Sequence, residues 1–280
     1  ESIRLIHACS DLGITFLDTA AGYGNGHSEE VVGRALEGPR RDDWIIETKG
    51  GEGFHPDGTN YKDFSKAHLL RQLEASLRRL RTDRVDVYLL HGPSAADIAA
   101  GECLEALAQI RRDGKARLVG VSLGPPAMGL DLIARGGMDV FQVSLSLTDI
   151  AVTSALLPAA AAAGIGIVAR CAFGAGFLTG AVDAATAFSD QDRRSWQSAE
   201  SKAARAETAR RLAFLTRPGR TQAQACLQFP LAFPGVSTVI AGSKSLEHMR
   251  ENAAASSAPA LTPAELAGID RALGRITATP

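Results

Sequence analysis

Short apolar segments alternate with helical segments along almost the whole chain, and this alternation limits the possible folds more than any other feature. Helical periodicity is clearest where Leu69, Leu73, Leu77 and Leu80 follow the N-cap candidate Ser65. Alternating strands and helices require crossover connections, so they predict a parallel sheet that is buried on both faces. The seven predicted strands span Ile14–Leu17, Trp44–Glu47, Val85–Leu90, Ala116–Val121, Val140–Val143, Ile165–Ala169 and Thr238–Ile240.

Two architectures satisfy this pattern, an open doubly wound sheet and a closed eight-stranded barrel. The glycines after the first predicted strand, Gly22, Gly24 and Gly26, lack the G-x-G-x-x-G spacing of a dinucleotide-binding open sheet. Polar residues instead follow the ends of several strands, which is typical of a barrel. We therefore expect an α/β fold of the (β/α)8 TIM barrel type. Seven strands do not close such a barrel; because the chain opens in a helix that runs to about Leu12, the first strand is expected upstream of Glu1, and the alternative is an unusual open barrel.

No linker interrupts the repeat, so residues 1–280 are predicted to form a single domain. The longest uncharged stretch, residues 150–169, contains Pro158 and Gly164 and fits a helix over 153–163 followed by a strand better than it fits a membrane span. A capping-box sequence predicts a last helix over Pro263–Leu273. The segment Phe173–Lys202 follows a strand and is predicted to be a long loop of the kind that barrel enzymes use as a lid.

Composition argues against several classes of function. The 30 Lys and Arg residues and 31 Asp and Glu residues give a net charge of −1, which argues against broad electrostatic binding of nucleic acid or of an anionic membrane. The four cysteines lack paired metal-ligand spacing, so neither a metal site nor a disulfide framework is predicted. We expect a cytoplasmic protein whose partner is a small molecule, and the sequence predicts no particular oligomeric state.

Four polar residues stand out by their chemistry and placement. Asp18, Lys49 and His91 follow consecutive predicted strands, and Tyr23 lies five residues after Asp18. An ammonium beside a phenol favours the phenolate, and a carboxylate keeps that ammonium charged and oriented. An imidazole at the same edge could polarise a carbonyl. Each residue taken singly also fits a capping, solvated or packing role, so it is their joint placement that predicts a tuned proton donor.

The motifs around these residues are similar to those of a known family. The segments Phe16–Gly24 and Gly26–Glu29 resemble the D-T-A-x-x-Y-G-x-G-x-S-E segment of the aldo-keto reductase superfamily. Further motifs occur in that family's order, namely Thr48-Lys49, Asp86–His91, Gly114-Lys115, Gly120–Ser122, Gln142-Val143, Gly176–Gly180 and Gly242–Asn252. The resemblance implies an eight-stranded barrel and hydride transfer from NADPH to an aldehyde, a ketone or a sugar carbonyl. It also implies roles for the four residues: Tyr23 as general acid, Lys49 and Asp18 as the pair that tunes it, and His91 as the group that orients the carbonyl.

The resemblance also implies a cofactor site, although the sequence differs from the family's pattern at two of its positions. Ser122 and Gln142 would hold the nicotinamide carboxamide, but Leu123 stands where the family has Asn, and Arg170 stands where it commonly has a stacking aromatic ring. Lys244 at a helix start suits a 2′-phosphate, which favours NADPH over NADH. The implied cofactor residues are Ser122, Gln142, Arg170, Phe173, Gly174, Gly176, Ser243, Lys244, His248, Glu251 and Asn252.

Loop aromatics are the candidates for the substrate pocket. The loops predicted to shape it are Gly50–Tyr61, Gly92–Ala95 and the stretch Phe173–Trp196. Phe54, His55, Tyr61 and Trp196 lie on these loops, where they could contact substrate or only pack the loops. Two other functions are open: a regulatory relative that binds the cofactor without catalysis, and a barrel lyase or isomerase that uses Lys49 as a Schiff base. The presence of all four catalytic candidates argues against the first. The lack of an evident phosphate-binding loop argues against the second.

Overall fold

The structure is a computed structural model that describes residues 1–275 except 56, 184 and 190–192; of residues 38–40, 193 and 196 only the backbone is described. The chain divides into two compact units. Unit 1 contains Glu1–Val143, Ala159–Ile167 and Lys244–Leu246, and unit 2 contains Ser144–Pro158, Val168–Ser243 and Glu247–Pro280. Within the described residues, no helix combines the length and the apolar character that a membrane crossing needs.

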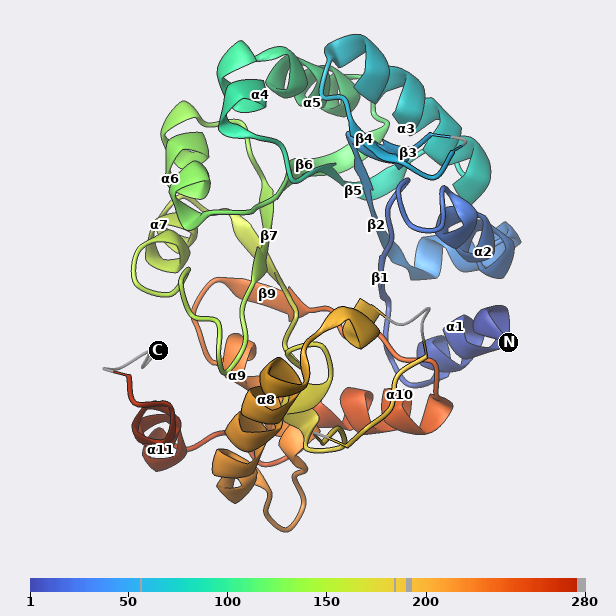
Figure 1. Cartoon of the computed structure of the whole chain (residues 1–280). Coiled ribbons are helices and arrows are strands. Elements are labelled where there is room, and N and C mark those ends of the chain that lie inside the picture. The colour runs from blue at the N-terminus through green and yellow to red at the C-terminus, as the bar shows by residue number, and fades with distance from the viewer. Residues whose placement is uncertain (56, 184, 190–192, 276–280) are drawn as a thin grey trace. The chain divides into compact units, whose positions relative to one another are not determined.

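Unit 1 is a regular alternation of strands and helices, as the sequence pattern predicts. After α1 (Ser2–Asp11), its strands are β1 (Phe16–Asp18), β2 (Ile45–Gly50), β5 (Val85–His91), β6 (Ala116–Ser122) and β7 (Val140–Ser144). The helical elements between them are α2 (His27–Ala35), η1 (Gly38–Asp43), α3 (Lys66–Leu80), α4 (Ala95–Ala100), α5 (Glu102–Arg112) and α6 (Pro126–Arg135). Figure 1 shows α2, α3, α5 and α6 running beside the strands that they connect.

The strands pair in parallel and in chain order. The ladders β1–β2, β2–β5, β5–β6 and β6–β7 are all parallel, and the order of the seven-stranded sheet is β1-β2-β5-β6-β7-β8-β9. Sequential order with helical crossovers is the βαβ arrangement that the alternation predicts. In unit 1 the carboxyl ends of the strands therefore share one edge, and Asp18 and His91 are the last residues of β1 and β5.

The first strand begins two residues later than the apolar pattern predicts. It is Phe16–Asp18 rather than Ile14–Leu17. The N–H of Ile14 bonds at 3.0 Å to the carbonyl of Cys9, in the turn that follows α1. Ile14 therefore still belongs to the turn that ends α1, and the strand begins after it.

Helix α3 confirms the leucine pattern. Ser65 caps it by accepting a 3.4 Å hydrogen bond from the N–H of His68. The helix packs against α2, α5 and β2. Its four leucines are at most 4% exposed, so the spacing of three and four residues places them on one buried face. They are Leu69, Leu73, Leu77 and Leu80.

A short antiparallel hairpin follows β2, where a loop over Gly50–Tyr61 was expected. It consists of β3 (Glu52–Phe54) and β4 (Asn60–Lys62). Gly51 makes the bend into it with a φ of +96°, and a Cβ at this position would collide with the ring of Phe64. Apolar patterning misses the hairpin because its strands are three residues long and contain a single buried residue.

Unit 2 carries the later elements of the chain. Three of them also have residues in unit 1, namely α7 (Leu156–Ala162), β8 (Gly166–Arg170) and α10 (Leu246–Ala253). The others are η2 (Phe177–Thr179), η3 (Arg193–Trp196), α8 (Ala199–Arg211), η4 (Ala213–Leu215), α9 (Gln222–Leu231), β9 (Val236–Val239), η5 (Ala254–Ser256) and α11 (Pro263–Leu273). The predicted last helix is confirmed with its capping box of Thr262 and Glu265. The predicted last strand, Thr238–Ile240, begins earlier, at Val236.

Two further expectations for this part of the chain are corrected. The helix predicted over 153–163 is shorter, because the hydroxyl of Thr153 bonds to the carbonyl of Ile150 and residues 151–155 form turns. The segment Phe173–Lys202 is only partly irregular, since it includes η2, η3 and the first turn of α8. Phe177 and Leu178 in η2 are buried, which ties the start of this segment to unit 2.

Candidate active site

The ladder registers of unit 1 bring polar residues from distant parts of the chain to one edge. Asp18 pairs with Glu47 in the β1–β2 ladder. His91 pairs with Ser122 between β5 and β6, and Ser122 pairs with Gln142 between β6 and β7. Residues separated by up to 124 positions in sequence therefore become neighbours at the carboxyl ends of the strands.

Lys49 is the centre of this group. Its side chain is fully buried, and its ammonium donates to the Asp18 carboxylate and, at 2.9 Å, to the carbonyl of Thr19. The nitrogen lies 5.2 Å from the centre of the Tyr23 ring. Burial alone would lower the pKa of Lys49, but its acidic neighbours, first Asp18 and then Tyr23 and Glu47, raise it above its ordinary value. Lys49 is therefore a permanent cation beside the phenol ring.

Tyr23 is presented from a tight loop and is 41% exposed, so its side chain is accessible to a ligand. Its ring meets the imidazole of His91 edge to face, with centroids 5.7 Å apart and planes at 82°. The loop returns to α2 through Gly24, Asn25 and Gly26, which all have positive φ. A Cβ at Gly26 would also collide with the side chain of Arg79, so the glycine spacing serves the turn that presents Tyr23.

His91 contacts a carboxylate that the sequence did not single out. Its Nδ1 lies 3.0 Å from Oε2 of Glu52, which is the first residue of β3. Glu52 is held in turn by Asn60, whose amide donates to Oε1 at 2.7 Å, and by Gln72, which donates to the backbone carbonyl at 2.9 Å. Burial lowers the pKa of His91 below its ordinary value; Glu52 opposes this shift and Lys49 adds to it.

A second carboxyl group, Glu47, lies below the Asp18–Lys49 pair and was also missed. The amide nitrogen of Gln142 donates to Glu47 at 2.6 Å and to Asp18 at 2.9 Å. The amide oxygen of Gln142 accepts from the hydroxyl of Ser122 at 3.0 Å. Gln142, which is predicted to bind the cofactor, is thus bonded directly to the catalytic candidate Asp18, and Ser122 is joined to that group through Gln142. An acidic residue inside an apolar strand was the available signal, but Glu47 was taken only as the end of that strand.

The structure therefore brings together all four predicted catalytic residues, Asp18, Tyr23, Lys49 and His91. The candidate substrate residues of the hairpin pack partly on each other: the rings of His55 and Tyr61 are 4.9 Å apart, while Phe54 is 38% exposed. The side chain of Trp196, the remaining candidate, lies outside the described residues.

The loop after β8 in unit 2 has a backbone suited to an anion. Gly174, Ala175 and Gly176 have φ of +53°, +60° and +91°. The N–H groups of Phe173 and Ala175 donate to no group in the described part of the chain. Successive amides in such a conformation form a concave donor site for phosphate oxygens. Of the predicted cofactor residues in this loop, only Phe173 has its N–H available, because the N–H groups of Gly174 and Gly176 already donate to the carbonyls of Cys171 at 2.8 Å and Phe173 at 2.9 Å.

The other predicted cofactor residues are distributed over both units. Glu251 lies in α10 and already accepts the hydroxyl of Thr221 at 2.6 Å. Ser243, His248 and Asn252 also belong to unit 2, whereas Lys244 belongs to unit 1. Arg170 is the last residue of β8 and donates to Sγ of Cys171 at 3.4 Å.

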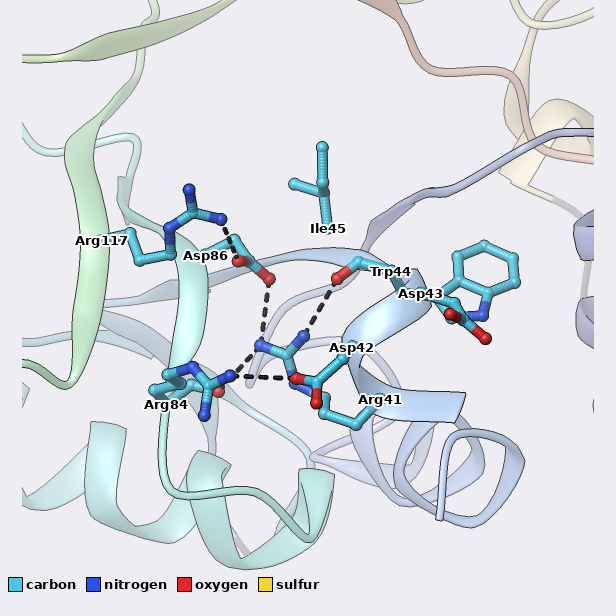
Figure 2. Close-up of a pocket in the computed structure, with 8 residues that line it drawn as sticks. All are labelled: Arg41, Asp42, Asp43, Trp44, Ile45, Arg84, Asp86 and Arg117. Carbon is cyan, nitrogen blue, oxygen red and sulfur yellow. Dashed lines mark hydrogen bonds and ion pairs between the residues drawn. The ribbon is translucent and has the colours of Figure 1, made fainter. Parts of the chain in front are cut away.

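A different charged pocket lies at the amino ends of β2, β5 and β6 (Figure 2) and has no part in this site. Its lining residues are Arg41, Asp42, Asp43, Trp44, Ile45, Arg84, Asp86 and Arg117. Asp86 accepts from Arg41 and Arg117 at 3.0 Å and from the N–H of Ile46 at 2.9 Å. Burial tends to raise the pKa of Asp86, but these donors lower it below its ordinary value. Its arginines are matched by aspartates, so the pocket is a structural ion network.

The chain belongs to the Aldo/keto reductase family, whose profile matches residues 1–273. It is 32% identical over 269 residues to the uncharacterised oxidoreductase YqkF of Bacillus subtilis, covering 95% of this chain and 85% of the relative. The glycerol dehydrogenase of Gluconobacter oxydans superposes with a TM-score of 0.83 at 28% identity, over 99% of this chain and 86% of the other. An aldo-keto reductase of Klebsiella pneumoniae in complex with NADPH superposes with a TM-score of 0.75 at 28% identity, with the same coverage.

These similarities confirm three predictions from the sequence. The family resemblance is confirmed by the profile match. The predicted (β/α)8 barrel class is confirmed by the solved aldo-keto reductases and by the seven-stranded parallel sheet. The prediction of an oxidoreductase is confirmed by the family and by the similarity to YqkF.

Proposed function

We propose that this protein reduces an aldehyde or ketone, including a sugar carbonyl, with NADPH, and that Tyr23 is the general acid. The observation that carries the proposal is the contact set of Lys49, which is fully buried, bound to Asp18 and 5.2 Å from the ring of the accessible Tyr23. A binding protein without catalysis has no chemical need for a buried ammonium beside an exposed phenol.

Each residue of the group has a definable part in this reaction. Tyr23 donates its proton to the carbonyl oxygen, and Lys49 stabilises the phenolate that remains. Asp18 keeps Lys49 charged and fixes its position. His91, edge-on to Tyr23, is the second polar group at the substrate oxygen and orients the carbonyl. Glu52, whose Oε2 lies 3.0 Å from Nδ1 of His91, acts on the imidazole through its charge.

The chain's donor groups fit NADPH, which supplies the hydride when bound. The loop over Phe173–Gly176 offers the N–H groups of Phe173 and Ala175 to the pyrophosphate, and Lys244 with Ser243 suits the 2′-phosphate. Ser122 and Gln142 are the residues for the carboxamide, and His248, Glu251 and Asn252 are the residues for the adenosine end. The NADPH complex of the related reductase of Klebsiella pneumoniae supports this choice of cofactor.

The first test is a fluorescence titration with NADPH and NADH, followed by a panel of carbonyl compounds. We expect tighter binding of NADPH, because Lys244 pairs with the extra phosphate, and oxidation of NADPH only when a carbonyl is added. Lys244→Met should weaken the binding of NADPH and leave that of NADH unchanged. Binding without turnover of any carbonyl would favour the regulatory alternative. Trapping of a substrate on Lys49 by borohydride would favour the lyase alternative.

Arg170 leads to a second prediction about the cofactor. A guanidinium can stack on a planar ring, but over the cationic oxidised nicotinamide it is repulsive. Arg170→Tyr should therefore tighten NADP⁺ more than NADPH in calorimetric titrations. Leu123→Asn is the matched control, since a new carboxamide hydrogen bond of about 0.5 to 1.5 kcal/mol should tighten both forms equally. An unchanged affinity ratio in Arg170→Tyr would show that Arg170 does not lie over the ring.

A further inference from the structure

Glu47 is a fully buried carboxyl group inside the site of unit 1. It lies two residues before Lys49 in β2, and because side chains alternate along a strand, both side chains are on the same face of the sheet. Its partner across the β1–β2 ladder is Asp18. The register alone therefore places a second carboxyl group beside the Asp18–Lys49 ion pair.

The contacts of the two carboxyl groups differ. Lys49 donates directly to Asp18, whereas its nitrogen is 4.0 Å from Oε1 of Glu47. Gln142 donates one amide group to both, at 2.9 Å to Asp18 and 2.6 Å to Glu47. The other oxygen of Glu47, Oε2, accepts a hydrogen bond from no described group. Asp18 thus accepts a hydrogen bond directly from the cation, whereas Glu47 accepts one from the neutral amide of Gln142 and lies 4.0 Å from the cation.

Charge balance decides which group keeps a proton. A buried carboxylate with an unpartnered oxygen is far more costly than a neutral carboxyl group. Two carboxylates that share one ammonium cannot both ionise cheaply in a dry site. The pKa of Glu47 is raised well above its ordinary value. Burial is the largest cause, and the hydrogen bond and the charge of Asp18 add to it, while Lys49 and Gln142 oppose the shift.

We propose that Glu47 is a positioning residue that works in its protonated form and directs the charge of Lys49 toward Tyr23. As a neutral group it anchors Gln142 beneath the ion pair and adds no second negative charge beside the ammonium. Lys49 then stabilises the phenolate of Tyr23 with its full charge. The groups that face Glu47 are Asp18 from β1, Lys49 from β2 and Gln142 from β7. This role rests on the proposed function, because it concerns Tyr23 as the acid.

The decisive measurement is the pH dependence of unfolding, which does not require activity. The unfolded chain releases the Glu47 proton above the ordinary carboxyl pKa, while the folded protein retains it, so folding becomes less favourable as the pH rises. Glu47→Gln cannot ionise and lacks this penalty. From about pH 5 upward, the unfolding constant of the wild type should rise relative to that of Glu47→Gln by up to about tenfold per pH unit, until Glu47 ionises in the folded protein.

Two further variants separate protonation from packing. Glu47→Leu should share the pH slope of Glu47→Gln but be less stable at every pH, because the amide of Gln142 loses an acceptor. Glu105→Gln, an exposed carboxylate in α5 paired with Lys66, should keep the slope of the wild type. Equal slopes for the wild type and Glu47→Gln would mean that Glu47 is ionised in the folded protein and would overturn the proposal.

The pH profile of turnover tests the link to Tyr23. Ionisation of Glu47 at alkaline pH should lower turnover in the wild type, and Glu47→Gln cannot undergo this step. The profile of the variant should be flatter up to the pH at which Tyr23 itself ionises, and identical profiles would refute the positioning role. If the pH slopes of unfolding differ between the wild type and Glu47→Gln but the protein shows no reductase activity, the proposed function is wrong and the protonation of Glu47 still holds. Equal slopes in an active enzyme would contradict only the inference about Glu47.

Discussion

Tyr23→Phe should reduce carbonyl reduction by roughly 10²- to 10⁴-fold, the usual contribution of a positioned general acid. The phenylalanine ring can keep the edge-to-face contact with His91 at 5.7 Å and its place 5.2 Å from Lys49. The cofactor contacts come from other segments, so NADPH affinity should change little. The loss should therefore appear in kcat, measured by the oxidation of NADPH at saturating substrate.

Tyr88→Phe is the matched control for this variant. Tyr88 is fully buried in β5, and its hydroxyl forms no hydrogen bond with the described residues. Burial is the main cause that raises the pKa of this phenol, and the charge of Glu29 adds to it. The phenol therefore stays protonated and donates no proton to a substrate. Removal of its hydroxyl should leave turnover and stability close to those of the wild type. If Tyr23→Phe were as active as Tyr88→Phe, another group would have to be the proton donor.

The fold was predictable because its signals are local and repeated. The leucines of α3 and the apolar run Val85–Leu90 each report on one element, and their alternation fixes the parallel order of the strands. Boundaries were less predictable, because they depend on single backbone contacts such as the bond from Ile14 to Cys9. The hairpin β3–β4 was missed because it has no buried face long enough to show a period of two.

The site was predictable where chemistry and placement coincide. Asp18, Lys49 and His91 follow predicted strands, and a parallel sheet brings such positions together whatever their distance in sequence. Glu52 could not be found this way, because its contact with His91 depends on the unpredicted hairpin. Glu47 could have been found, since strand periodicity places it on the same face as Lys49. What periodicity cannot give is its protonation, which depends on the contacts of Asp18 and Gln142.

Lys49→Met should produce the largest loss of stability. The variant removes a fully buried ammonium and leaves the Asp18 carboxylate, whose side chain is 13% exposed, without its cation. Breaking a buried pair in this way typically costs about 3 to 5 kcal/mol, because one charge is left uncompensated. The loss should be measured by urea unfolding at neutral pH. Lys115→Met is the control, because Lys115 is 37% exposed and its pair with Glu74 at 3.4 Å should contribute less than about 1 kcal/mol.

A second substitution shows whether charge is the cause of that loss. Asp18→Asn in the Lys49→Met background removes the stranded carboxylate and keeps a group that can accept the amide of Gln142. The double variant should therefore be more stable than Lys49→Met alone. Two independent losses of stability would instead add and make the double variant less stable. If the two losses add, the cost of Lys49→Met comes from packing of the lysine chain.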